Sequence, residues 1–157
     1  MTSLELFALI EHSDIGLFIS KQDHMVGAIA QLLHITGLIL VLSSVLIVSL
    51  RLVGQGPRAL SSAQLAATTG KFVWIGLGLL LVSGLVMFVP AALLYHPNTF
   101  FRVKFLLLAL ALVVHVTLYR KVAQSNQVGT ALSWTTAVVS LGLWFGIAIM
   151  GRFIGFF

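Results

Sequence analysis

Four long apolar stretches, separated by short polar breaks, dominate the pattern of the chain. They cover residues 26–53, 71–95, 99–120 and 131–154, and each exceeds or approaches the roughly 20 apolar residues that cross a bilayer. Inside lipid every backbone polar group needs an internal partner, so the pattern predicts helices. The breaks carry typical turn residues, namely Gly54, Gly56 and Pro57, then His96, Pro97 and Asn98, then Ser125, Asn126 and Gly129. We therefore expect an all-α membrane four-helix bundle and a single domain over residues 1–157.

The segment 1–22 has shorter apolar turns. It opens with Thr2-Ser3-Leu4-Glu5, which has the spacing of a capping box, and its second apolar turn ends at Phe18. The pattern predicts an N-terminal amphipathic helix that lies on the membrane surface.

Composition supports a membrane protein and excludes several kinds of chemistry. Hydrophobic residues make up 59% of the chain and charged residues 8%, with a mean hydropathy of +1.10. The absence of cysteine excludes disulfides, thiolate metal sites and cysteine nucleophiles. The nine Lys and Arg residues are scattered, which does not predict nucleic-acid binding. No phosphate-binding loop or nucleophile motif is present, so we expect neither hydrolysis nor phosphoryl transfer.

Basic residues predict the orientation, because cytoplasmic loops are enriched in Lys and Arg. Arg51, Arg58 and Lys71 flank the first break, and Arg120 and Lys121 flank the third. These loops are expected in the cytoplasm and both termini outside. Arg102 and Lys104, which lie beside the second break, favour the opposite orientation.

Three ionisable residues lie within the predicted spans, where such groups are costly and usually functional. His34 stands in Leu33-His34-Ile35, with Gly37 nearly one turn later. Its imidazole could bind haem iron or another metal, with Gly37 leaving room for a macrocycle. Alternatively, His34 bonds to a neighbouring helix and Gly37 serves close helix packing.

Lys104 and His115 are eleven residues apart, which places them on one face of the third span. Lys104 lies near the depth of His34, either at the propionates or iron of a haem or, with Arg102, reaching to the headgroups. His115 lies roughly 15 Å deeper, too far to ligate the same haem, and a structural role is favoured.

Two further histidines, His24 and His96, lie near the same outer surface as His34. They either complete a site with His34 or lie in solvent-exposed loops. In the fourth span, Gly142 with Gly146 and Gly151 with Gly155 have GxxxG spacing, which favours close packing within the bundle or between copies.

Several short runs form a pattern that covers nearly the whole chain: Leu9-Ile10-Glu11, Ile15-Gly16, Leu33-His34, Gly37, Leu50-Arg51-Leu52, the run Pro97 to Leu106, and Gly151-Arg152-Phe153-Ile154. In these runs the sequence resembles a family of small four-helix bacterial membrane proteins of unknown function. The resemblance implies a multi-pass protein of the bacterial inner membrane and supplies no activity. With the orientation expected from the basic residues, both termini would be periplasmic.

A more distant likeness is to HemJ-type membrane protoporphyrinogen oxidases. Leu33-His34-Ile35, the run Val103 to Leu106 and His115 are similar to motifs there, and the likeness implies haem b held near His34 and Lys104. The stretch Leu40 to Ser44 departs from that family, which argues against porphyrinogen oxidation. A histidine-led helix is also similar to CopD-type copper-resistance proteins, so copper is the alternative metal.

Three functions follow as hypotheses. The first is a membrane protein like a b-type cytochrome, which holds haem at His34 with Arg102, Lys104 and His96 nearby and passes electrons between a quinone and a redox partner. The second is a non-catalytic accessory or assembly subunit, or a homo-oligomer, that docks through the GxxxG face. The third is an oxidase acting on a tetrapyrrole.

Overall fold

The computed structural model describes residues 2–57, 59–125 and 128–156, and these residues form helices and turns with no strand. Four helical segments are long and apolar enough to cross a membrane: His24–Leu52, Ser62–Tyr95, Thr99–Gln124 and Ala131–Phe153. The predicted four-helix architecture is confirmed to this extent. Arg58 and Asn126, which the sequence placed in the connecting loops, lie outside the described residues.

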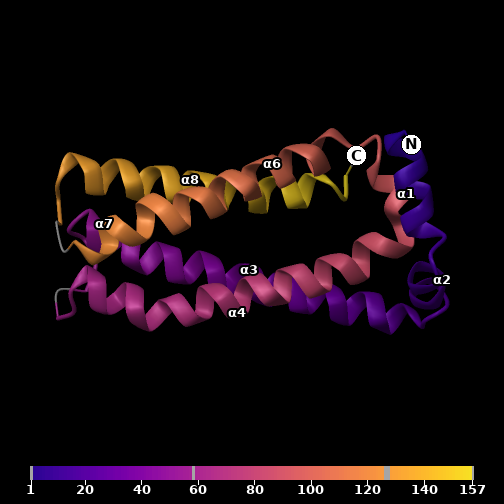
Figure 1. The fold of residues 1–157 in the computed structure, drawn as a ribbon. Helices are drawn as coiled ribbons and strands as arrows, with labels where there is room; N and C mark the ends of the chain where they lie inside the picture. The colour runs from indigo at the N-terminus through magenta and orange to yellow at the C-terminus, as the bar shows by residue number, and fades with distance from the viewer. Residues whose placement is uncertain (1, 58, 126–127, 157) are drawn as a thin grey trace.

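The long helices form two antiparallel pairs (Figure 1). Helix α3 (His24–Leu52) packs along α4 (Ser62–Phe88), and α6 (Thr99–Val114) packs along α8 (Ala131–Phe153). We call the end where α3 ends and α8 begins the loop end, and the opposite end the N-terminal end. The two pairs lie close together at the loop end and diverge toward the N-terminal end.

The second helix begins earlier than its apolar pattern predicts. Ser61 and Gln64 form a capping box that starts α4 nine residues before Lys71. At the other end, Pro90 lacks a backbone N–H, and the helix tightens into the 3-10 turn η1 (Val89–Ala91) before α5 (Ala92–Tyr95). The first and fourth predicted spans match their helices to within two residues at both ends. The third begins at Thr99 as predicted but continues past residue 120 to Gln124.

The N-terminal segment is two helices, so the expectation of one helix over residues 1–22 is wrong. The predicted capping box at Thr2 and Glu5 is present and starts α1 (Ser3–Glu11). Ser13 then accepts a hydrogen bond from the Gly16 amide and caps α2 (Asp14–Ser20). A side-chain cap restarts the helix in a new direction, which a continuous apolar pattern does not reveal. Both helices lie across the N-terminal end (Figure 1).

The third span contains a π turn. After α6, the π turn η2 (His115–Tyr119) leads into α7 (Arg120–Gln124). The Arg120 amide donates to the His115 carbonyl, an i to i+5 bond. Such turns are rare and frequently lie at functional sites.

The large buried apolar side chains lie mainly in the half of the bundle nearer the loop end. They include Val41, Val45, Val48 and Leu52 of α3, Leu65 of α4, Tyr119, Val122, and Trp144 and Ile147 of α8. Toward the N-terminal end, the buried side chains of the four long helices are small, as at Ala30 and Ser83. The interior of the N-terminal half is therefore filled by partly buried and polar groups.

Close contact between glycines joins α3 to α4. A Cβ atom built on Gly37 would lie 2.7 Å from the Gly76 carbonyl oxygen, and the reciprocal distance is also 2.7 Å. Gly37 thus serves close helix packing and leaves no room for a macrocycle. In α8, Gly146 faces Leu107 and Gly151 faces Lys104, so these two glycines pack within the bundle, whereas nothing lies within 4 Å of a Cβ built on Gly142.

Candidate functional site

His34 forms a hydrogen bond from α3 to Ser83 of α4. The His34 Nδ1 and Ser83 Oγ atoms are 2.9 Å apart, and Ser83 Oγ also lies 2.5 Å from the Leu79 carbonyl oxygen. A serine has one hydroxyl proton, and a carbonyl can only accept. That proton therefore goes to Leu79, and His34 Nδ1 donates its own proton to Ser83. This assignment leaves a lone pair on Nε2.

The Nε2 atom of His34 points toward the other helix pair. It lies 3.5 Å from Nζ of Lys104, which comes from α6. The ammonium can donate to the imidazole lone pair, and both side chains are half-buried. The sequence placed these two residues at similar depth, and the structure brings them together. Ser83, His34 and Lys104 form a polar chain across three helices, which we call the His34 triad.

Two glycines border this triad. A Cβ built on Gly84 would lie 3.4 Å from Cε1 of His34, and one built on Gly151 would lie 3.4 Å from Nζ of Lys104. The glycines come from α4 and α8, so all four long helices contribute to the site. Side chains larger than hydrogen at these positions would press on the imidazole and the ammonium.

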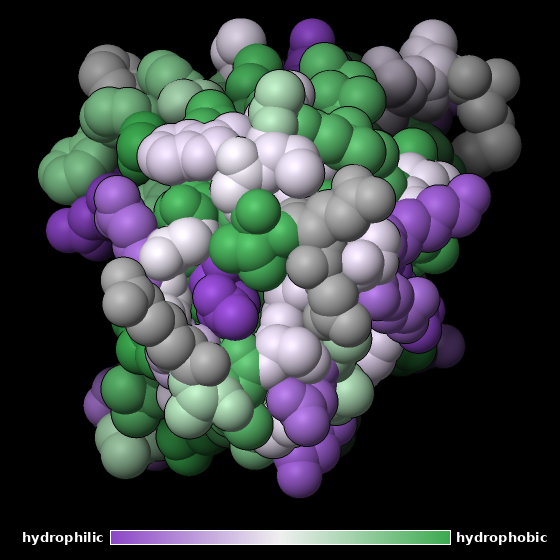
Figure 2. All heavy atoms as spheres, turned by 90° about the vertical axis from the view of Figure 1, so that its left-hand side faces the viewer, coloured by the Kyte–Doolittle hydropathy of each residue, from purple (hydrophilic) through white to green (hydrophobic). Residues whose placement is uncertain are grey.

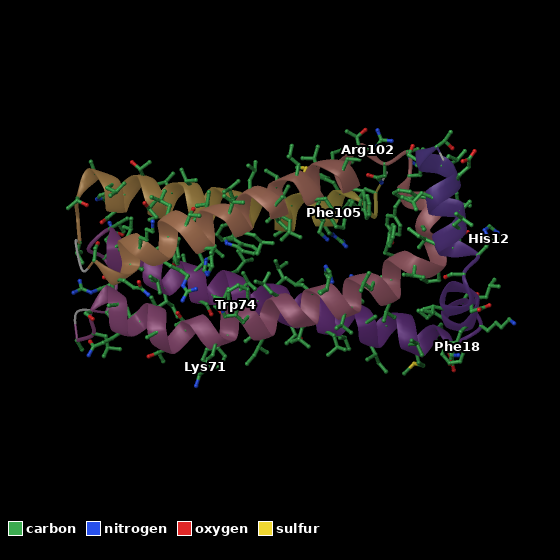
Figure 3. All side chains as sticks on the ribbon, viewed as in Figure 1. His12, Phe18, Lys71, Trp74, Arg102 and Phe105 are labelled. Carbon is green, nitrogen blue, oxygen red and sulfur yellow. The ribbon has the colours of Figure 1, made fainter. Side chains whose placement is uncertain are left out.

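Arg102 and His96 belong to a separate place at the N-terminal end. Arg102 donates from Nη2 to the His96 carbonyl oxygen (2.9 Å), and the His96 ring bonds to Ser3 Oγ of α1 (3.1 Å). Both residues line a cavity of about 370 Å³ whose other walls are largely aromatic, made by Ser3, Phe7, Tyr95, Phe101 and Phe105. Figure 3 shows Arg102 and Phe105 near α1. His24 pairs with Asp23 at 2.5 Å in an exposed turn.

His115 lies apart from the His34 triad, in the π turn nearer the loop end. Its side chain is 6% exposed, and its Nδ1 atom has no hydrogen-bond partner among the described residues. Its ring stacks on Tyr119, with centroids 5.1 Å apart, and Tyr119 donates to the Val45 carbonyl (3.0 Å). The imidazole also lines a cavity of about 310 Å³ between α3, α4 and α7. The sequence placed His115 away from His34 but did not predict this cavity.

Sequence reasoning missed Ser83 and Gly84, and it named Gly151 only for close helix packing and not as a neighbour of Lys104. Each is an ordinary small residue in an apolar span, and its role depends on which helix faces it. The one available signal was that Ser83 and Gly84 are adjacent small residues in the second span, at a depth comparable with that of His34. That signal does not distinguish a site from close helix packing.

The donor set of the site is small. Within the part of the chain that the structure describes, no three His, Cys, Asp or Glu side chains gather into a group able to hold a metal ion. The His34 triad supplies one imidazole, one amine and one hydroxyl. A metal ion that needs three or four protein ligands does not fit this set, whereas a metal that brings its own equatorial ligands does.

Comparison with known proteins gives one family and no activity. The model of a family of unknown function (DUF6644) matches residues 6–157. No curated protein and no solved structure matches the chain. The predicted membership of a family of unknown function is confirmed, and no similarity to HemJ-type oxidases or to any haem protein is found.

Proposed function

We propose, for a chain that belongs to the DUF6644 family of unknown function, that it is a membrane protein that binds haem b at His34 and takes part in electron transfer. The carrying observation is the bond between His34 and Ser83. Histidines that ligate a metal almost always donate their other ring proton to a second group, which fixes the tautomer and the ring orientation. His34 Nδ1 makes such a bond at 2.9 Å, and Nε2 keeps the lone pair that an iron would take.

The chemistry of the donor set supports haem over copper. A copper site is built from several soft or imidazole ligands, and His34 has no second histidine and no thiolate beside it. Haem iron receives four nitrogens from its macrocycle, so one imidazole suffices to hold it. Lys104, 3.5 Å from Nε2, would help to hold the haem, either by binding the iron as a neutral amine after losing a proton or by pairing with a propionate as an ammonium.

The His34 triad joins the two helix pairs, which diverge toward the N-terminal end (Figure 1). Its side chains come from α3, α4 and α6, and Gly151 of α8 lies beside Lys104. A haem held by His34 would therefore lie between the two pairs. Haem bound there would exchange one electron at a time between Fe(II) and Fe(III), with a quinol and an exported protein as its partners.

The test is an absorption spectrum of the protein purified from haem-replete cells, together with the haem content per chain. Wild type is expected to carry one haem per chain. His34→Ala is expected to lose at least nine-tenths of it, and Ser83→Ala to lower haem affinity roughly tenfold, in the range known for partners of metal ligands.

His96→Ala is the matched control, because His96 bonds to Ser3 and not to the triad. It should keep the wild-type haem content. A colourless wild-type protein that also fails to bind added haem would show the proposal to be wrong. Equal loss in His96→Ala and His34→Ala would contradict the assignment to His34.

The orientation is part of this proposal. The positive residues at the loop end support a cytoplasmic location for that end, and the His34 triad would then lie toward the outer face of the bacterial inner membrane. The chain has no cysteine, so single cysteines can be labelled without background. An impermeant maleimide should label Gln22→Cys in intact cells, and label Gln55→Cys only after permeabilisation. The reverse pattern would invert the assignment.

A further inference from the structure

The cavity beside His115 lies between α3, α4 and the π turn. Its wall on α4 follows one face of small residues, Ala63, Ala66, Ala67 and Gly70, which leaves the space open. A Cβ built on Gly70 would meet nothing within 4 Å. Val45, Val48, Val73 and Trp74 add apolar surface, and the volume of about 310 Å³ is in the range of small-molecule sites.

Three hydroxyl groups that line the cavity already donate hydrogen bonds to backbone carbonyls. Ser44 donates to the Leu40 carbonyl, Thr69 to that of Leu65, and Tyr119 to that of Val45. These oxygens offer only lone pairs. The remaining side-chain donors are His115, Gln124, the indole N–H of Trp74, and the cations Lys71 and Arg120. No carboxylate lines the cavity, so its chemistry suits a neutral or anionic ligand with oxygen acceptors and not a cation.

The positions of the two cations, Lys71 and Arg120, are explained without a ligand in the cavity. Lys71 and Arg120 are both exposed, and the Lys71 side chain extends away from the bundle (Figure 3). Figure 2 shows hydrophilic side chains around the edge of the loop end, where the headgroups of a membrane would lie. These positions are expected of residues that reach the headgroups.

His115, in contrast, is not explained by its surroundings. Its side chain is more than nine-tenths buried, its Nδ1 is unpartnered among the described residues, and it lies in a π turn. A buried polar atom without a partner costs about 1–3 kcal/mol. The His115 side chain also lines the cavity, so a ligand oxygen there could accept a hydrogen bond from the imidazole.

We propose that this cavity binds the head group of a quinone. A quinone ring is flat and apolar on its faces, which suits walls made by Trp74, Tyr119 and Val48. It carries two carbonyl acceptors on opposite edges. One accepts a hydrogen bond from His115, and the other faces the donors Arg120 and Gln124 nearer the loop end. The quinone ring is uncharged. This fits a cavity whose deep wall is formed by a buried imidazole and not by a buried pair of charges.

The inference deepens the proposed function, because it assigns a binding site to the quinone with which the haem protein would exchange electrons. The role of the quinone in electron transfer rests on the proposed function, whereas the binding of the quinone does not. Quinone binding needs only the cavity, so its failure and the failure of haem binding are separable.

The test is equilibrium binding of decylubiquinone to the purified protein in nanodiscs, measured by dialysis against the ligand. Gly70→Leu fills the cavity from α4, and His115→Phe removes the polar partner. Each is expected to weaken binding at least tenfold. Gly78→Leu is the matched control, since Gly78 also lies in α4 and is also open, but it does not line the cavity. It should bind within twofold of wild type.

Three outcomes would overturn the inference: no binding by folded wild type, equal binding by wild type and Gly70→Leu, or saturable binding of oleate but not of decylubiquinone. If His115→Phe does not fold, Gly70→Leu decides the result. A colourless protein that binds decylubiquinone and loses it in Gly70→Leu supports the site while refuting haem. A haem-loaded protein without quinone binding refutes this site alone.

Discussion

His34 and His115, the two histidines inside the membrane-spanning segments, differ in how their ring nitrogens are used. His34 has partners on both nitrogens, Ser83 at 2.9 Å and Lys104 at 3.5 Å, and lies in regular helix. Among the described residues His115 has no partner for Nδ1, and it lies in a π turn and borders a cavity. The first is preorganised by protein groups, whereas the second is held mainly by stacking on Tyr119.

The comparison distinguishes a histidine whose orientation is fixed by other helices from one that is free to bind a further group. His34 is oriented by interactions between helices, so changes in helix packing should alter its site strongly. His115 is held by its own turn and by Tyr119, so its neighbours can change with smaller effects on the fold. The following changes test that contrast, beginning with the largest expected effect.

Gly37→Leu should disrupt the fold. Its side chain would meet the Gly76 carbonyl, 2.7 Å from the ideal Cβ position, and would push α3 from α4. We expect a loss of more than ~3 kcal/mol, the upper range for overpacking, and little monodisperse protein on size exclusion. Gly27→Leu in the same helix, where nothing lies within 4 Å, is the control. Normal yield of Gly37→Leu would refute the close contact.

Ser83→Ala should destabilise the protein by about 1–3 kcal/mol, because it removes the side-chain partner of His34 Nδ1. The measurement is an SDS titration of the folded protein in mixed micelles. Ser43→Ala removes a comparable hydroxyl that donates only to backbone carbonyls of its own helix. It should cost less than ~0.5 kcal/mol. A double-mutant cycle of Ser83→Ala with His34→Leu should then show coupling, and its absence would refute the bond.

Tyr119→Phe should cost about 1 kcal/mol, the usual contribution of one hydrogen bond, here to the Val45 carbonyl. The same SDS titration measures it. The ring and its stacking on His115 remain, so the cavity should keep its shape. A loss above ~3 kcal/mol would mean that Tyr119 supports the His115 region far more than a single bond does.

Thr136→Val should have the smallest effect. The Thr136 hydroxyl is buried and has no partner among the described residues. Replacing it with a methyl group of similar size should change the free energy of unfolding by less than ~1 kcal/mol, or raise it. A larger loss would indicate that this hydroxyl bonds to an ordered water in the bundle.

The sequence predicted the long helices well, because a span is a local property. Each span is an uninterrupted apolar run of sufficient length, and its breaks carry Gly, Pro or Asn at turns. Local capping was also visible, as at Thr2 and Glu5. The second helix starts before its apolar run, at Ser62, because Ser61 and Gln64 cap a stretch whose exposed face is polar.

The partners of His34 were not predictable, because they depend on how the helices rotate about their axes. Lys104 could be matched to His34 by depth, but Ser83 could not be distinguished from other serines in the spans. Gly37 shows the same limit: its position allowed either a space or a close contact, and only its pairing with Gly76 decided between them. The π turn at His115 has no signature in its sequence.

The contact between Glu11 and Leu93 has a consequence for the order of biosynthesis. The Glu11 carboxylate accepts a hydrogen bond from the Leu93 amide (2.7 Å), and these residues are 82 positions apart in the chain. At about 5–20 residues per second, a ribosome needs roughly 4–16 s to make that interval. During this time α1 and α2 exist without their docking partner, while two spans are still being inserted. The first helices to be translated are therefore the ones that must wait for a later part of the chain before they can dock.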